Sequence, residues 1–132
     1  MAGAARREDR PVSPHLQVWR WHVTMLSSIL HRATGVALYG AAVGFALWLM
    51  IAAWGAERYR LVGDILNAWY GQAALYLIVA ALAYHLANGV RHLIFDTGAG
   101  LNPSDADASA WFAILFAIAA PAGLWLLLTY GG

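Results

Sequence analysis

Three long stretches of this chain carry no Asp, Glu, Lys or Arg, and they constrain the fold more than any other feature. They cover residues 33–56, 65–90 and 108–132. Each exceeds the roughly 20 residues that an α-helix needs to cross the hydrocarbon core of a bilayer. Only 11% of the residues are charged, which leaves too little polar surface for a soluble domain of this size. The sequence therefore predicts an all-α integral membrane protein with three transmembrane helices, with a soluble apolar bundle as the alternative.

The predicted organisation is a short polar N-terminal region followed by one membrane domain. Residues 1–27 are interpreted as a cytoplasmic tail leading into an interfacial helix over residues 15–28, and residues 28–132 as the membrane domain. The spans are placed at about residues 28–54, 65–95 and 106–130. The segment "GAERYRLVGD" between the first two spans is interpreted as a short outside loop.

The distribution of arginine predicts the orientation in the membrane. The chain has no Lys, and most of its Arg residues precede the first uncharged stretch: Arg6, Arg7, Arg10, Arg20 and Arg32. The positive-inside rule then places the N-terminus in the cytoplasm and the C-terminus outside. Glu8 and Asp9 argue against a mitochondrial transit peptide, so a bacterial inner membrane is expected and the mitochondrial inner membrane is the alternative. The net charge of +1 gives no indication of nucleic-acid binding.

The second span contains the candidate chemical site, in the segment "YHLANGVRH". His85, Gly89 and His92 fall within about 60° of one another on a helix, whereas Arg91 points elsewhere. An ionisable residue inside the hydrocarbon is costly and is a functional candidate by default. His85 is interpreted as an axial haem ligand, with Gly89 leaving room for a flat macrocycle. A structural histidine between helices and a proton relay are the alternatives.

A single helix cannot supply both axial ligands of one haem. His85 and His92 are separated by about 10.5 Å along the helix axis, too far for two ligands of the same iron. His31 is expected near the cytoplasmic end of the first span, too shallow to oppose His85. A second axial ligand, if the haem is bis-histidine, would then have to come from another chain.

The segment "SSILHRATG" brings polar side chains to the cytoplasmic end of the first span. His31 and Arg32 are at a suitable depth to bind haem propionates, since Arg makes charge-assisted bidentate bonds to carboxylates. Ser28 lies one helical turn before Arg32, and this pair suits the oxygens of a quinone head group. An Arg that snorkels to the lipid headgroups, with Ser28 as an interfacial cap, is the alternative.

Together, "RPVSPHLQVWRW", "SSILHRATG" and "YHLANGVRHLIFDTG" resemble the cytochrome b556 membrane-anchor family of succinate dehydrogenase (complex II) over about residues 10–100. The resemblance implies that His85 is the axial ligand of haem b. It also implies that Ser28 and Arg32 line a ubiquinone pocket, and that His31, Arg32 and His92 lie near the propionates.

The same resemblance implies partner subunits. These are a second small membrane anchor that supplies the other haem ligand, an iron–sulfur subunit and a flavoprotein subunit. The chain contains no Cys and no dinucleotide-binding fingerprint, so those redox centres must lie elsewhere. The expected function is that of a non-flavin anchor subunit of succinate:ubiquinone oxidoreductase, with no complete active site in this chain alone. A fumarate reductase anchor and a non-redox membrane scaffold are the alternatives.

Overall fold

The structure is a computed structural model that describes Leu16 and residues 19–131. Four α-helices make up this part of the chain: α1 (Val23–Ala53), α2 (Ala56–Asn67), α3 (Trp69–Asp96) and α4 (Pro103–Tyr130). Three of them, α1, α3 and α4, are long and apolar enough to cross a membrane. The predicted all-α fold with three spans is confirmed.

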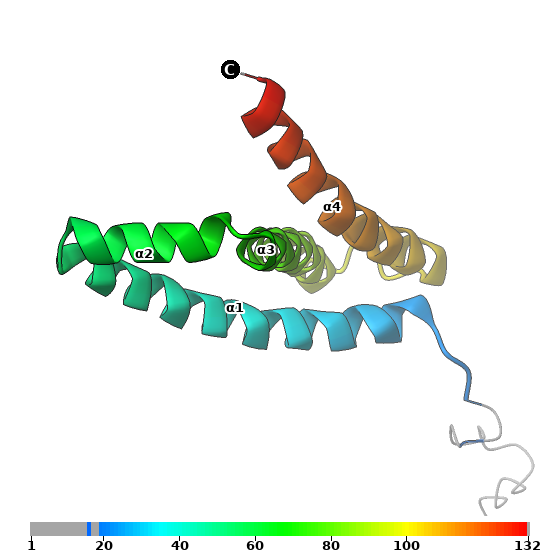
Figure 1. Cartoon of the computed structure of the whole chain (residues 1–132). Coiled ribbons are helices and arrows are strands. Elements are labelled where there is room, and N and C mark those ends of the chain that lie inside the picture. Colours follow the sequence, from blue (N-terminus) through cyan, green and yellow to red (C-terminus); the bar gives the residue numbers. More distant parts are fainter. Residues whose placement is uncertain (1–15, 17–18, 132) are drawn as a thin grey trace, which may run out of the picture.

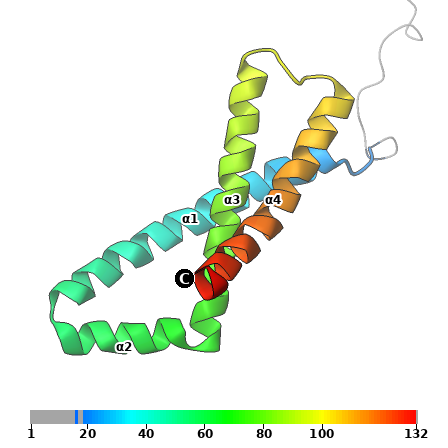
Figure 2. The ribbon, with the colours of Figure 1, turned by 90° about the horizontal axis from the view of Figure 1, so that it is seen from above.

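Helix α3 is the centre of the arrangement, because its contacts with the other three helices are more extensive than those of any other helix. Figure 1 views α3 nearly end-on, with α1 beneath it and α4 rising away from it toward the C-terminus. Figure 2 shows the same helices from above, where α1 crosses α3 at an angle and α2 lies between their outer ends. The C-terminal half of α4 therefore diverges from α1.

Small and polar residues form the buried interior of the described chain. The buried apolar residues are Ala83, Tyr84, Ala110 and Ala113. Large apolar side chains point outward instead; Val36 on α1 is 76% exposed and Leu127 on α4 is 69% exposed. An exposed apolar surface of this extent suits lipid rather than water. Small residues between the helices allow close backbone approach, as is typical of helix packing in membranes.

Helix α2 occupies the segment that the sequence analysis interpreted as a loop. The charged residues of that segment suggested a loop, but they lie on one exposed side of an amphipathic helix whose Val62 and Leu66 are half-buried. Gly55, with φ +119°, makes the sharp turn between α1 and α2. Gly71 on α3 packs against the end of α2, where an added Cβ would lie 2.7 Å from the Leu66 Cα atom.

The span boundaries also differ from those predicted. The helices that contain the candidate spans begin at Val23, Trp69 and Pro103, and Pro suits the first turn of a helix. The sequence analysis expected an interfacial helix over residues 15–28; in the structure positions 19–22 are not helical and position 23 already belongs to α1. The polar tail over residues 1–14 lies outside the described residues.

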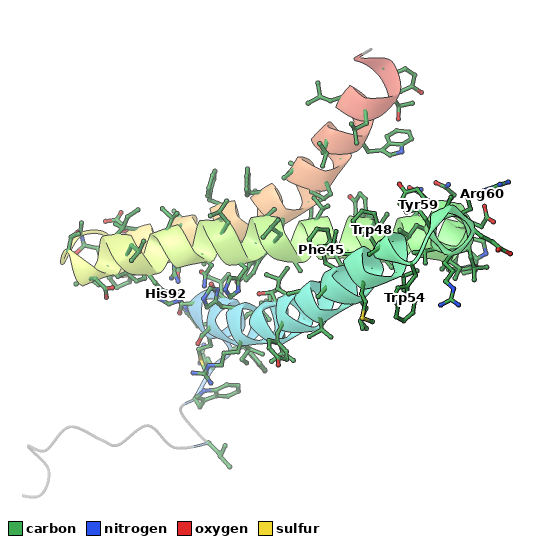
Figure 3. All side chains as sticks on the ribbon, turned by 90° about the vertical axis from the view of Figure 1, so that its left-hand side faces the viewer. Phe45, Trp48, Trp54, Tyr59, Arg60 and His92 are labelled. Carbon is green, nitrogen blue, oxygen red and sulfur yellow. The ribbon has the colours of Figure 1, made fainter. Side chains whose placement is uncertain are left out.

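Aromatic side chains mark the end of the molecule where α1 meets α2. Trp48 and Tyr59 lie with ring centroids 6.1 Å apart, and the Arg58 guanidinium lies 5.1 Å from the Trp54 ring centroid. Figure 3 shows Trp48, Trp54 and Tyr59 together at this end, with His92 near the opposite end of α3. Tryptophan and tyrosine favour the membrane–water interface, so this end suits one headgroup region and the histidine end the other.

Candidate haem and quinone site

Three histidines from two helices meet where α1 crosses α3. The rings of His31 and His85 are stacked, with centroids 4.0 Å apart and planes inclined by 9°. The His92 ring centroid lies 5.2 Å from that of His31. His31 was expected to be too shallow to oppose His85, and the premise about its depth is wrong, because the two rings are in contact. Helix α1 begins earlier and crosses α3 obliquely, which brings His31 to the depth of His85.

The crossing of α1 over α3 also determines the surroundings of His85. Its Nδ1 atom lies 3.2 Å from Thr34 Oγ1. At Gly35, an added Cβ would lie 3.2 Å from His85 Cε1, so any other residue there would push the ring away from the α1 backbone by a few tenths of an ångström. Among the described residues, no hydrogen bond involves His85 Nε2. One ring nitrogen thus faces α1 and the other is available to a ligand.

A buried polar network joins α1, α3 and α4 beside the histidines. Ser27 Oγ donates to Asn88 Oδ1 at 2.8 Å, and both residues have no exposed surface. Tyr84 donates its hydroxyl proton to the backbone oxygen of Ser27 at 2.8 Å. The Arg91 guanidinium donates to Ser109 Oγ at 2.8 Å. Arg91 points away from His85, as predicted, and is held by α4.

The sequence analysis missed this network, although a signal for it was present. Tyr84, Asn88 and Arg91 follow one another at spacings of four and three residues, which puts them on one face of α3. That face lies next to the one that carries His85 and His92. Asn88 connects the two faces, because its Nδ2 atom lies 3.2 Å from His92 Nε2. Polar groups paired across helices in this way avoid the cost of unsatisfied groups in hydrocarbon.

Ser28 and Arg32 occupy the side of α1 next to this cluster. Ser28 is half-buried and Arg32 is exposed, and within the described part of the chain neither makes a side-chain hydrogen bond or ion pair. The structure places them one turn apart, as predicted, but does not enclose them in a pocket. The neighbouring His31 has a buried Nδ1 atom with no hydrogen-bond partner among the described residues. Such an atom is available to a ligand oxygen.

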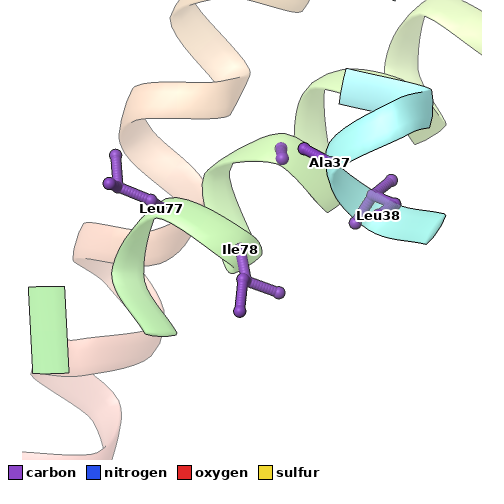
Figure 4. A pocket seen from close by; sticks show the side chains of 5 residues that line it. Ala37, Leu38, Leu77 and Ile78 are labelled. Atoms are coloured by element: carbon purple, nitrogen blue, oxygen red, sulfur yellow. The ribbon is translucent and has the colours of Figure 1, made fainter. Parts of the chain in front are cut away.

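Two observations support a flat cofactor at His85. A Cβ added at Gly89 would meet nothing within 4 Å, so the helix surface one turn beyond His85 is open. A cavity of about 100 Å³ lies between α1 and α3 on the other side of His85 (Figure 4). Its lining is apolar and consists of Ala37, Leu38, Leu77, Ile78 and Ala81. The residues present fit the edge of a macrocycle, and the chain by itself encloses only part of one.

The sequence matches a family described as "Succinate dehydrogenase/Fumarate reductase transmembrane subunit" over residues 6–124. It is 38% identical to the succinate dehydrogenase cytochrome b556 subunit of Paracoccus denitrificans over 104 residues, which are 79% of this chain and 80% of that protein. It is 32% identical to the Rickettsia felis protein of the same name over 117 residues, or 89% of this chain and 91% of the relative.

A mitochondrial protein is similar too. The mouse succinate dehydrogenase cytochrome b560 subunit is 32% identical over 118 residues, covering 88% of this chain and 70% of that protein. The family match spans all three apolar helices almost completely, and the bacterial relatives align over most of their own length. This chain therefore belongs to the succinate dehydrogenase/fumarate reductase transmembrane subunit family.

Proposed function

We propose that this chain is the cytochrome b membrane-anchor subunit of a succinate:ubiquinone oxidoreductase, and that it holds haem b through His85. The observation that carries the proposal is the setting of His85 on a membrane-spanning helix. Its Nδ1 edge rests on α1, whereas its Nε2 atom has no hydrogen-bond partner among the described residues. A neutral imidazole nitrogen is a common axial ligand of haem iron. When bound, haem supplies one-electron redox chemistry.

The propionates of the haem would be held at the histidine end of the site. His31 and His92 lie there with ring centroids 5.2 Å apart, and Arg32 follows His31 on α1. The unpartnered Nδ1 atom of His31 offers a hydrogen-bonding position. Arg32 adds a positive charge with the fork geometry that carboxylates bind. These residues lie on the side of His85 away from the apolar cavity, which suits a macrocycle with one polar edge.

A second axial ligand is expected from a partner anchor subunit. Two axial ligands approach iron from opposite sides of a macrocycle, whereas the rings of His31 and His85 lie face to face at 4.0 Å with no space for one between them. His92 is on the same helix as His85. The cavity of about 100 Å³ is also well below the roughly 300–1,000 Å³ typical of ligand pockets. A second anchor would supply both the ligand and the missing walls.

Two further partners follow from the chemistry of succinate oxidation. The chain contains no Cys to hold an iron–sulfur cluster. Electrons would therefore reach the site from an iron–sulfur subunit, which receives them from a flavoprotein subunit. In this arrangement the chain anchors both subunits and contributes to the quinone site without containing a complete active site.

Ubiquinone is the proposed substrate near the cytoplasmic end of α1. Ser28 and Arg32 lie one turn apart, and Arg32 is exposed and free of ion pairs within the described residues. A hydroxyl donor and a guanidinium aimed at the quinone oxygens would stabilise the negative charge that develops there during reduction. The charge distribution favours a cytoplasmic N-terminus in a bacterial inner membrane, with a mitochondrial inner membrane as the alternative.

A reduced-minus-oxidised absorption spectrum tests the proposal. The complex is purified in mild detergent with its co-purifying subunits, as wild type and as His85→Ala. We expect a b-type band in the wild type and its loss in the variant, with His22→Ala as a matched control that keeps the band. A wild-type complex without any pigment would favour a non-redox scaffold. A fumarate reductase anchor would give the same spectrum, and the redox potentials would distinguish the direction of catalysis.

A further inference from the structure

We propose that Thr34 is a positioning residue that holds His85 in the tautomer whose Nε2 lone pair is free to bind iron. The inference rests on the proposed function, namely that His85 ligates haem. It assigns a role to a residue of α1 that the sequence analysis did not single out. Thr34 is half-buried and lies between His31 and the close contact at Gly35.

The first step is to account for the single proton of the Thr34 hydroxyl. Thr34 Oγ1 lies 2.8 Å from the backbone oxygen of Leu30 and 3.0 Å from that of His31. Both are carbonyl oxygens, which only accept hydrogen bonds, and oxygens this close are favourable neighbours only when the hydroxyl proton points toward the carbonyls. The lone pairs of Oγ1 are then the groups that face His85.

The second step concerns the imidazole. His85 Nδ1 lies 3.2 Å from Thr34 Oγ1. Because the hydroxyl proton of Thr34 already points at the backbone carbonyls, the hydrogen bond between Thr34 and His85 forms only if Nδ1 carries a hydrogen and donates it. In neutral imidazole a hydrogen on Nδ1 leaves the lone pair on Nε2. The tautomer selected by Thr34 is therefore the one with Nε2 as the metal-binding nitrogen.

The orientation of the ring is restricted on two further sides. Its Cε1 edge lies against Gly35, where an added Cβ would be 3.2 Å away. One flat face lies against His31, with ring centroids 4.0 Å apart and planes inclined by 9°. Residues of α1 thus contact one edge and one face of the His85 ring and select its tautomer.

This arrangement has a measurable consequence for bound haem. A ligating histidine that donates its other N–H to an oxygen is a more basic and better oriented ligand, and loss of such a partner costs about 10–100-fold in metal affinity. A more basic ligand stabilises ferric iron over ferrous iron. Removing the acceptor should therefore weaken haem retention and raise the midpoint potential.

The experiment compares three variants of the complete complex, purified with its partner subunits. Thr34→Val removes the acceptor at nearly constant volume, and Thr34→Ser keeps it. Thr129→Val is the matched control, since Thr129 also donates to the carbonyl four residues earlier, at 2.8 Å, but lies near the end of α4. The readouts are haem per complex after prolonged washing, the haem midpoint potential, and succinate oxidation by a soluble dye.

We expect Thr34→Val to lose haem about tenfold or more faster than wild type and to show a raised midpoint potential. Thr34→Ser and Thr129→Val should match the wild type, and dye reduction should be unchanged in all three. Wild-type haem retention and potential in Thr34→Val would overturn the inference. A wild-type complex without a His85-dependent haem would instead overturn the proposed function.

Two further measurements keep the inference testable if Thr34→Val fails to assemble. Thr34→Ala removes the same acceptor without placing a second methyl group at the position. In the reduced wild-type complex, ¹⁵N NMR of labelled histidine should show a protonated Nδ1 for His85. A protonated Nε2, or a ring without an Nδ1 hydrogen, would contradict the assignment.

Discussion

The hydrogen bond between Ser27 and Asn88 should contribute measurably to the stability of the helix bundle. It is 2.8 Å long, wholly buried, and joins α1 to α3. Hydrogen bonds between membrane helices contribute on average about 0.6 kcal/mol and at most about 1.7 kcal/mol. We place this one in the upper half of that range because neither partner has any exposed surface through which water could replace it.

A double-mutant cycle isolates this contribution. Ser27→Ala and Asn88→Ala are made singly and together, and the free energy of unfolding is measured on the purified complex in detergent. We expect a coupling energy of about 1–1.7 kcal/mol, in addition to the separate losses of the Tyr84 and Arg91 contacts. Asn67→Ala at the exposed end of α2 is the control and should be neutral. A coupling energy below about 0.3 kcal/mol would refute the reasoning.

Three other predictions concern the α2–α3 corner, the quinone and the haem. Gly71→Ala should lower the free energy of unfolding by about 1–3 kcal/mol, because the added Cβ meets the backbone of Leu66. Gly63→Ala adds a Cβ in open space and should be tolerated, and thermal denaturation of the complex compares the two variants. Arg32→Ala should reduce quinone reduction much more than dye reduction, whereas Arg60→Ala should affect neither, and equal loss of both activities would contradict the assignment. Gly89→Leu should preserve assembly but lower haem content, since the added side chain enters open space where the macrocycle is proposed; unchanged haem content would argue against that placement.

The membrane fold was predictable because the absence of charge over a sufficient length is a local property of the sequence. The boundaries of the helices were harder to predict. The first helix extends back to Val23 through Ser27, Ser28 and Thr24, polar residues that the hydropathy pattern assigned to an interface. Helix α2 was missed for a related reason, since Arg58 and Arg60 indicate exposure without distinguishing an exposed loop from an exposed helix face.

The candidate site was predictable in part. The spacing of His85, Gly89 and His92 defines one face of α3 without any knowledge of its neighbours. The depth of His31 depends on the angle at which α1 crosses α3, which is a tertiary property, and its prediction was wrong. The contact between Thr34 and His85 depends on the same crossing and so could not be derived from spacing alone.

The family was easier to predict from the sequence than the packing of the helices. The expected complex II anchor family is confirmed by the match over residues 6–124 and by relatives of similar length. The resemblance was stated from short segments around His31 and His85, which can be read directly from the sequence. The arrangement that joins those motifs arises only when α1 and α3 pack together.

The most direct test of the account is an experimental density map of the assembled complex at His85. The account predicts iron bonded to His85 Nε2, a hydrogen bond from His85 Nδ1 to Thr34, and a second axial ligand from the partner anchor. An imidazole bonded only to protein atoms, with no porphyrin beside it, would contradict the account.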